Sequence, residues 1–144
     1  MARGGMEDDD TQLIQFRPEV VHAEYHLSAT AKRRQHPFSS NATVELEGSI
    51  TFADRAKITS CRLTVYGDSE DLAQRASERR ELLGSGGVQK GLWVGAVSVP
   101  DRDFASLVTM ALSGMLQCVS LHSRKGASHG WLVTSVGFST RPEI

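Results

Sequence analysis

Long hydrophobic runs are missing from this chain of 144 residues, and cysteine is scarce. No window approaches the ~18 consecutive apolar residues of a membrane-spanning helix, and positions 1–10 lack the apolar stretch of a secretory signal. The two cysteines, Cys61 and Cys118, lie far apart and inside apolar runs, a placement typical of buried, reduced thiols. We therefore expect a soluble cytoplasmic protein that forms no disulfide and has no membrane partner.

A large net charge is also missing. Sixteen Lys and Arg against seventeen Asp and Glu give a formal charge of −1, which argues against general attraction to nucleic acid or to an anionic membrane. An acidic run occupies positions 7–10. We expect residues 1–10 to form a disordered acidic leader. Residues 11–144 follow as a single β-rich domain, which is large enough to bury a core without a metal or a disulfide.

Aromatic residues make up only 6% of the chain. Proteins that bind single-stranded nucleic acid generally stack its bases on exposed aromatic side chains, so this composition does not favour that function. Two basic clusters nevertheless keep nucleic-acid binding as an alternative, because Lys and Arg neutralise backbone phosphates. These candidate contacts to nucleic acid or to an acidic partner are Lys32, Arg33, Arg34, Arg124 and Lys125.

The chain is rich in alternating apolar and polar residues, which is the period of a strand with one buried face. Residues 42–52 and 57–66 alternate in this way on either side of a short turn and predict an antiparallel hairpin. Residues 21–32 alternate as well, although Pro18 is also well placed at the first position of a helix. Strand and helix therefore both stay open for residues 19–32.

Helix formers replace β-branched residues over residues 68–83, and a second helical pattern covers residues 101–112 and ends at Gly114. Between these segments we expect a glycine-rich linker over residues 84–91 and a buried central strand over residues 92–99. Residues 115–123 and 131–140 predict a second hairpin with a longer loop. The predicted fold class is mainly β, a β-rich α+β domain. We expect an antiparallel two-layer sandwich or curled sheet of about six strands with two helices, with an α+β roll as the close alternative.

Residues 126–130 read Gly-Ala-Ser-His-Gly, which matches the G-x-S-x-G pattern of the nucleophile elbow in α/β-hydrolases. Such an elbow needs a strand before it, a helix after it, and an acid and a histidine later in the chain. Here a strand is predicted after the pattern, and no histidine follows it. The pattern therefore indicates a glycine-rich hairpin loop and no catalytic serine.

The closest histidines, His22 and His26, would be separated by roughly 14 Å on a strand and by about 6 Å on a helix. Only the helix would allow both to bind one metal ion. An enzyme or ligand-binding pocket would draw its polar groups from His22, Glu24, His26, His122 and His129. These residues form no complete set, so the sequence predicts no catalytic residues, no metal site and no cofactor.

The absence of a catalytic set makes a non-enzymatic function the first prediction. We expect a protein–protein interaction or assembly module, oligomeric, that uses a sheet edge, a helix or a loop surface. Its partner is either another protein or a second copy of the chain. The alternative is a nucleic-acid-binding module that uses the two basic clusters.

Overall fold

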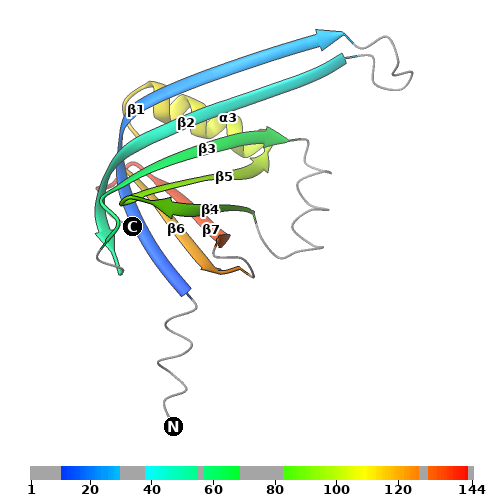
Figure 1. The fold of residues 1–144 in the computed structure, drawn as a ribbon. Helices are drawn as coiled ribbons and strands as arrows, with labels where there is room; N and C mark the ends of the chain where they lie inside the picture. Colours follow the sequence, from blue (N-terminus) through cyan, green and yellow to red (C-terminus); the bar gives the residue numbers. More distant parts are fainter. Residues whose placement is uncertain (1–10, 30–37, 55–56, 69–82, 127–129, 143–144) are drawn as a thin grey trace.

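The computed structural model describes residues 11–29, 38–54, 57–68, 83–126 and 130–142. Within them, seven strands form a closed barrel in the order β1-β2-β3-β5-β4-β7-β6 (Figure 1). All neighbouring strands are antiparallel except β3 and β5, which are parallel. The elements are β1 (Thr11–Ala29), β2 (Phe38–Ala53), β3 (Ser60–Asp68), β4 (Gly84–Gln89), β5 (Leu92–Pro100), α3 (Asp101–Leu112), β6 (Cys118–Lys125) and β7 (Trp131–Ser139).

Apolar side chains fill the interior of the barrel as the sequence predicts, because every second residue of a strand points inward. Cross-strand neighbours share a face, so Leu46 of β2, Leu63 of β3 and Gly95 of β5 form one inward row. Leu46 and Leu63 are fully buried. The strands expected over residues 21–32, 42–52 and 57–66 are confirmed as parts of β1, β2 and β3, and β1 ends at Ala29.

The expected two-layer sandwich is wrong, because β1 closes the sheet into a barrel. This strand is 19 residues long and pairs with β6 at its start and with β2 along most of its length. Its register shifts between Gln15 and Phe16 and again between Pro18 and Val20. Such bulges bend and twist a strand, which lets one strand bridge the two ends of the sheet.

The linker expected over residues 84–91 is also wrong, since residues 84–89 form β4 between β5 and β7. Two of its glycines, Gly84 and Gly86, serve close packing in the barrel wall. A Cβ atom on Gly86 would lie 2.5 Å from the Trp93 ring, and one on Gly95 of the facing strand would lie equally close to that ring. The small residues thus make room for a large buried side chain. A tight turn follows at Lys90 and Gly91, where both φ angles are positive.

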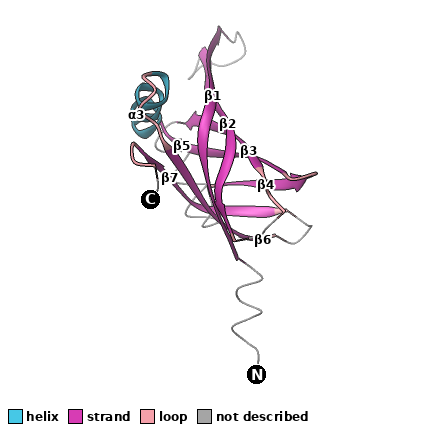
Figure 2. Cartoon of the chain, turned by 90° about the vertical axis from the view of Figure 1, so that its left-hand side faces the viewer, coloured by secondary structure: helices cyan, strands magenta, loops and turns pink. Residues whose placement is uncertain are grey.

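The helix α3 confirms the expectation for residues 101–112. Its buried residues Leu107 and Ala111 face the core, and Gly114 follows its end with a φ of 79°. The helix contacts β3, β5 and β1 and lies beside the barrel near the long hairpin of β1 and β2 (Figure 2). One helix is therefore described instead of two. Of the other expected helix, residues 69–82 lie outside the described part of the chain, as do residues 1–10 of the expected leader.

Within the described ranges, no helix has the length and apolar character needed to cross a membrane. The second hairpin is confirmed, because β6 and β7 pair antiparallel from Cys118 with Ser139 to Lys125 with Trp131. Both cysteines are buried, as expected, and neither is part of a disulfide.

Candidate interaction surface on the long hairpin

One long side of β1 leaves the barrel without a second strand. β6 pairs with β1 only over residues 11–16, whereas β2 pairs with it from Ile14 to Ala29. Among the described elements, residues 17–29 of β1 therefore have a strand partner on one side only. We call the other side of residues 17–29 the free edge, and the hairpin that these residues form with residues 38–49 of β2 the arm. In Figure 1 the free edge forms the upper rim of the arm.

The inner face of the arm continues the apolar lining of the barrel and becomes exposed further out. Val21 lies opposite the buried Leu46 and packs against the core. Four residues further along β1, Tyr25 lies opposite Ala42, and 69% of its surface is exposed. The outer half of the arm thus presents an aromatic side chain and the small exposed Ala23 without a covering element among the described residues.

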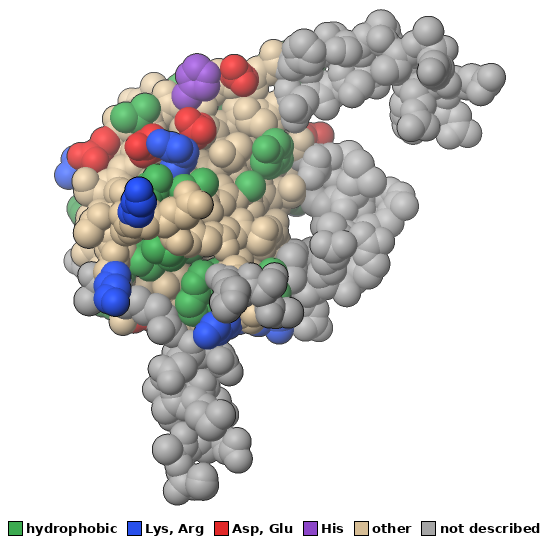
Figure 3. Space-filling view, in the orientation of Figure 1, with side chains coloured by type: hydrophobic (Ala, Val, Ile, Leu, Met, Phe, Trp, Pro, Cys, Tyr) green, Lys and Arg blue, Asp and Glu red, His purple; other side chains and the backbone are tan. Residues whose placement is uncertain are grey.

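The outer face of the arm is polar and mainly acidic. His22 lies opposite Glu45, and its Nε2 atom is 3.6 Å from a carboxylate oxygen of Glu24. Further into the sheet, the Arg62 guanidinium donates a 3.2 Å hydrogen bond to Glu47. In Figure 3 a histidine lies next to acidic side chains near the top of the molecule. The arm therefore carries acidic side chains and a histidine beside its free edge.

The strand geometry of residues 19–29 decides the question left open for the two histidines. Positions 22 and 26 of an extended strand are separated by roughly 14 Å, too far for both imidazoles to bind one metal ion. The described residues contain no cluster of three or more His, Cys, Asp or Glu that could hold a metal. The stripe from His22 to Glu24 is a polar outer surface of a strand.

The two basic clusters are attached to opposite ends of β1. Arg124 is exposed on β6 and pairs with Thr11, the first residue of β1, and the exposed Lys125 follows it. Lys32, Arg33 and Arg34 lie outside the described residues, between Ala29 and Phe38, which pair at the outer end of the arm. A ligand that touched both attachment points would span the whole of β1, roughly 60 Å of extended strand.

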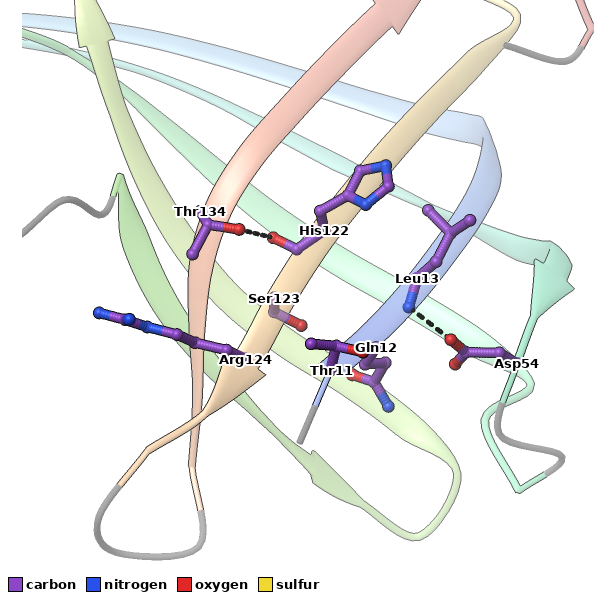
Figure 4. Close-up of a pocket in the computed structure, with 8 residues that line it drawn as sticks. All are labelled: Thr11, Gln12, Leu13, Asp54, His122, Ser123, Arg124 and Thr134. Carbon is purple, nitrogen blue, oxygen red and sulfur yellow. Dashed lines mark hydrogen bonds between the residues drawn. The ribbon is translucent and has the colours of Figure 1, made fainter. Parts of the chain in front are cut away.

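Arg124 belongs to a shallow groove of about 280 Å³ where β1 and β6 meet (Figure 4). Gln12 and Ser123 are almost fully buried there, and the Gln12 Oε1 and Ser123 Oγ atoms have no hydrogen-bond partner within the described part of the chain. Thr134 donates a hydrogen bond to the backbone carbonyl of His122 at 3.2 Å. The groove is completed by Thr11, Leu13 and Asp54.

No described part of the chain assembles a catalytic set. His122 lies on β6 and His22 on the arm, so the structure does not bring these two together, and the side chains of His26 and His129 are outside the described residues. Burial raises the pKa of the Cys61 thiol, so it is a poor source of thiolate. The Gly126 N–H donates to the Gly130 carbonyl at 2.8 Å and closes a loop between two strands, as expected for the G-x-S-x-G segment.

Comparisons with protein-family models, with curated proteins and with solved structures returned no match. The free edge is the feature that sequence reasoning did not locate. The nearest signal was the alternation of residues 21–32, which predicts a strand about as long as the arm but does not say which of its sides is paired.

Proposed function

We propose that this chain is a non-enzymatic protein-binding or assembly module that engages its partner by strand addition along the free edge of β1. The observation that supports this most directly is the end of the β1–β6 pairing at Phe16, while β1 continues to Ala29. Barrels generally eliminate sheet edges by closing. This one closes and still extends one strand well beyond the closure.

Backbone groups supply the affinity in such a contact. Along a strand, N–H and C=O groups point alternately to its two sides, so the free edge presents a row of donors and acceptors. A peptide or strand that pairs with this row gains main-chain hydrogen bonds, each worth about 0.5–1.5 kcal/mol net. Pro18 and the bulge beside it interrupt the edge only near the barrel.

The experiment compares one substitution at two exposed alanines. Ala23→Lys places a charge beside the free edge, a device that blocks strand pairing in natural sheets, whereas Ala105→Lys changes the exposed surface of α3. Sedimentation velocity of the fluorescently labelled chain, alone and in host-cell extract, measures whether it enters a larger species. We expect the wild type and Ala105→Lys to associate and Ala23→Lys to sediment as a monomer.

Two results would overturn this proposal. If the wild type sediments as a monomer both alone and in extract, it binds no partner by strand addition under these conditions. Equal association of the two lysine variants would place the contact away from the free edge.

Nucleic-acid binding stays the second candidate function, supported by the exposed Arg124 and Lys125. Electrostatic affinity is greatest at low salt, so titration with short DNA and RNA at low ionic strength is the sharpest test. Binding that falls steeply with added salt and is lost on replacing Arg124 and Lys125 by Ala would favour this function.

A further inference from the structure

We infer that the partner is a second copy of this chain, whose arm pairs antiparallel with the first along the free edge about a two-fold axis at Ala23. This inference rests on the proposed strand addition and adds the identity of the partner and the register. Closed two-fold dimers are the commonest soluble oligomers, and a two-fold axis lets one surface pair with itself.

The alternation of the strand restricts the possible registers. Residues directly opposite each other in an antiparallel pair lie on the same face of the sheet. In a two-fold pair of identical strands, each residue therefore lies opposite a residue whose number differs from its own by an even number. The two-fold axis then passes through one residue position, and that residue lies opposite its own copy. A register shifted by one would place the polar outer face of one arm beside the apolar inner face of the other.

The free edge runs from Arg17 to Ala29, and Ala23 is its midpoint. A register centred on Ala23 pairs residues 20–26 of one copy with the same segment of the second copy. These residues lie beyond the bulge between Pro18 and Val20, where the alternation of the strand is unbroken.

Polar complementarity favours the same register. With the axis at Ala23, His22 lies opposite Glu24 of the second copy, where an imidazole N–H can donate a hydrogen bond to the carboxylate, and symmetry makes this pair twice. An axis at Glu24 would place that carboxylate opposite its own copy, and like charges directly across a pair of strands destabilise it.

The apolar residues of the arm also find partners in this register. Tyr25, which is 69% exposed, lies opposite Val21 of the second copy on the inner face, where an aromatic and a β-branched residue form a favourable cross-strand pair. The small Ala23 leaves space at the axis. A contact made by one pair of strands buries less than the 1,200–2,000 Å² of a standard stable interface, so we expect a dimer with a dissociation constant in the micromolar range or weaker.

Disulfide trapping tests the register. Directly opposed residues of antiparallel strands have Cα atoms about 4.5–5.5 Å apart, within the range that a disulfide spans. The Ala23→Cys variant should therefore oxidise to a covalent dimer, whereas the matched Ala105→Cys variant on α3 should not. Both native cysteines are buried, so they do not compete for oxidation. Faster trapping of Tyr25→Cys than of Ala23→Cys would overturn the register.

Charge exchange tests the recognition. His22→Glu alone places Glu opposite Glu24 at both symmetric positions and should weaken self-association about tenfold. Glu24→Lys alone removes the same pairs. In a mixture of the two variants, both cross-strand pairs are again complementary, so the mixed dimer should recover wild-type affinity. No recovery in the mixture, with both variants folded by circular dichroism, contradicts the proposed pairing.

Sedimentation of the wild-type chain from about 1 µM to about 1 mM separates the two proposals. Concentration-dependent dimerisation that is lost in Ala23→Lys supports both. A chain that stays monomeric over this range but forms an Ala23→Lys-sensitive complex in extract overturns the second copy as partner and leaves strand addition standing. A chain that associates in neither condition overturns both.

Discussion

Trp93 is the bulkiest fully buried side chain among the described residues, and two glycines determine where its ring can lie. Gly86 on β4 and Gly95 on β5 approach the indole so closely that a methyl group on either would lie 2.5 Å from a ring carbon. Gly87, the next residue along β4, has no neighbouring atom within 4 Å of its Cβ position. Adjacent glycines of one strand thus perform different tasks.

Substitution by alanine should have different effects on stability at Gly86 and at Gly87. Gly86→Ala should lower the free energy of unfolding by about 1–3 kcal/mol, because the ring and the neighbouring backbone must shift to admit a methyl group. Gly87→Ala should leave it unchanged or raise it by about 0.4–1 kcal/mol, because alanine reduces the freedom of the unfolded chain. Urea denaturation of both variants measures the difference. Equal losses would show that the Trp93 ring does not fill the space beside Gly86.

The arm is the element on which the proposed function depends, and its two sides predict two rates of backbone exchange. N–H groups of residues 20–25 point alternately toward β2 and toward the free edge. In dilute solution, we expect every second amide of this segment to exchange with solvent quickly and its neighbours slowly. Hydrogen exchange followed by NMR resolves the two sets.

At high concentration the fast set should become slow, since the second copy would then accept those hydrogen bonds. Amides of residues 14–16, which have strand partners on both sides in β6 and β2, serve as the internal control. Their rates should not change with concentration. Protection that rises equally in both segments would indicate general stabilisation and no contact at the free edge.

Among the individual elements, the sequence predicted those strands and the helix whose apolar residues recur with a clear period. The strict alternation around Leu46 and Leu63 and the apolar face of Leu107 and Ala111 predicted β2, β3 and α3. β4 was missed because four of its six residues are Gly or Ser, which carry little periodic signal and have low strand propensity. Its Gly86 packs closely against the Trp93 ring of the neighbouring strand, a contact that local periodicity does not show.

At the scale of the whole molecule, local sequence patterns could not predict that the sheet closes into a barrel. It depends on β1 pairing with β6, more than one hundred positions away in the register of Thr11 with Arg124, and on the parallel pairing of β3 with β5. The position of the candidate surface follows from the same pairing, because the free edge begins where β6 ends. Local alternation predicted the strand but could not predict where its second neighbour stops.

The closed barrel also links one buried thiol to the stability of the whole molecule. Cys61 is fully buried in the core, and burial raises its pKa because the charged thiolate is poorly solvated there. In the unfolded chain the thiol ionises with an ordinary pKa of about 8.5. Between these pKa values the folded state keeps a proton that the unfolded state releases, so rising pH favours unfolding.

We therefore expect the contribution of Cys61 to stability to be fully present below about pH 8 and to be lost progressively at higher pH. The slope approaches 1.36 kcal/mol per pH unit at high pH, and about 2 kcal/mol is lost by pH 10. Cys61→Ala should unfold more easily at neutral pH because it leaves a cavity, yet its stability should fall less steeply above pH 8.5. Urea denaturation of both proteins across this pH range separates the effect of the thiol on stability from the effects of the lysines and tyrosines, which both proteins contain. Parallel curves for the two proteins would mean that the thiol already ionises in the folded barrel.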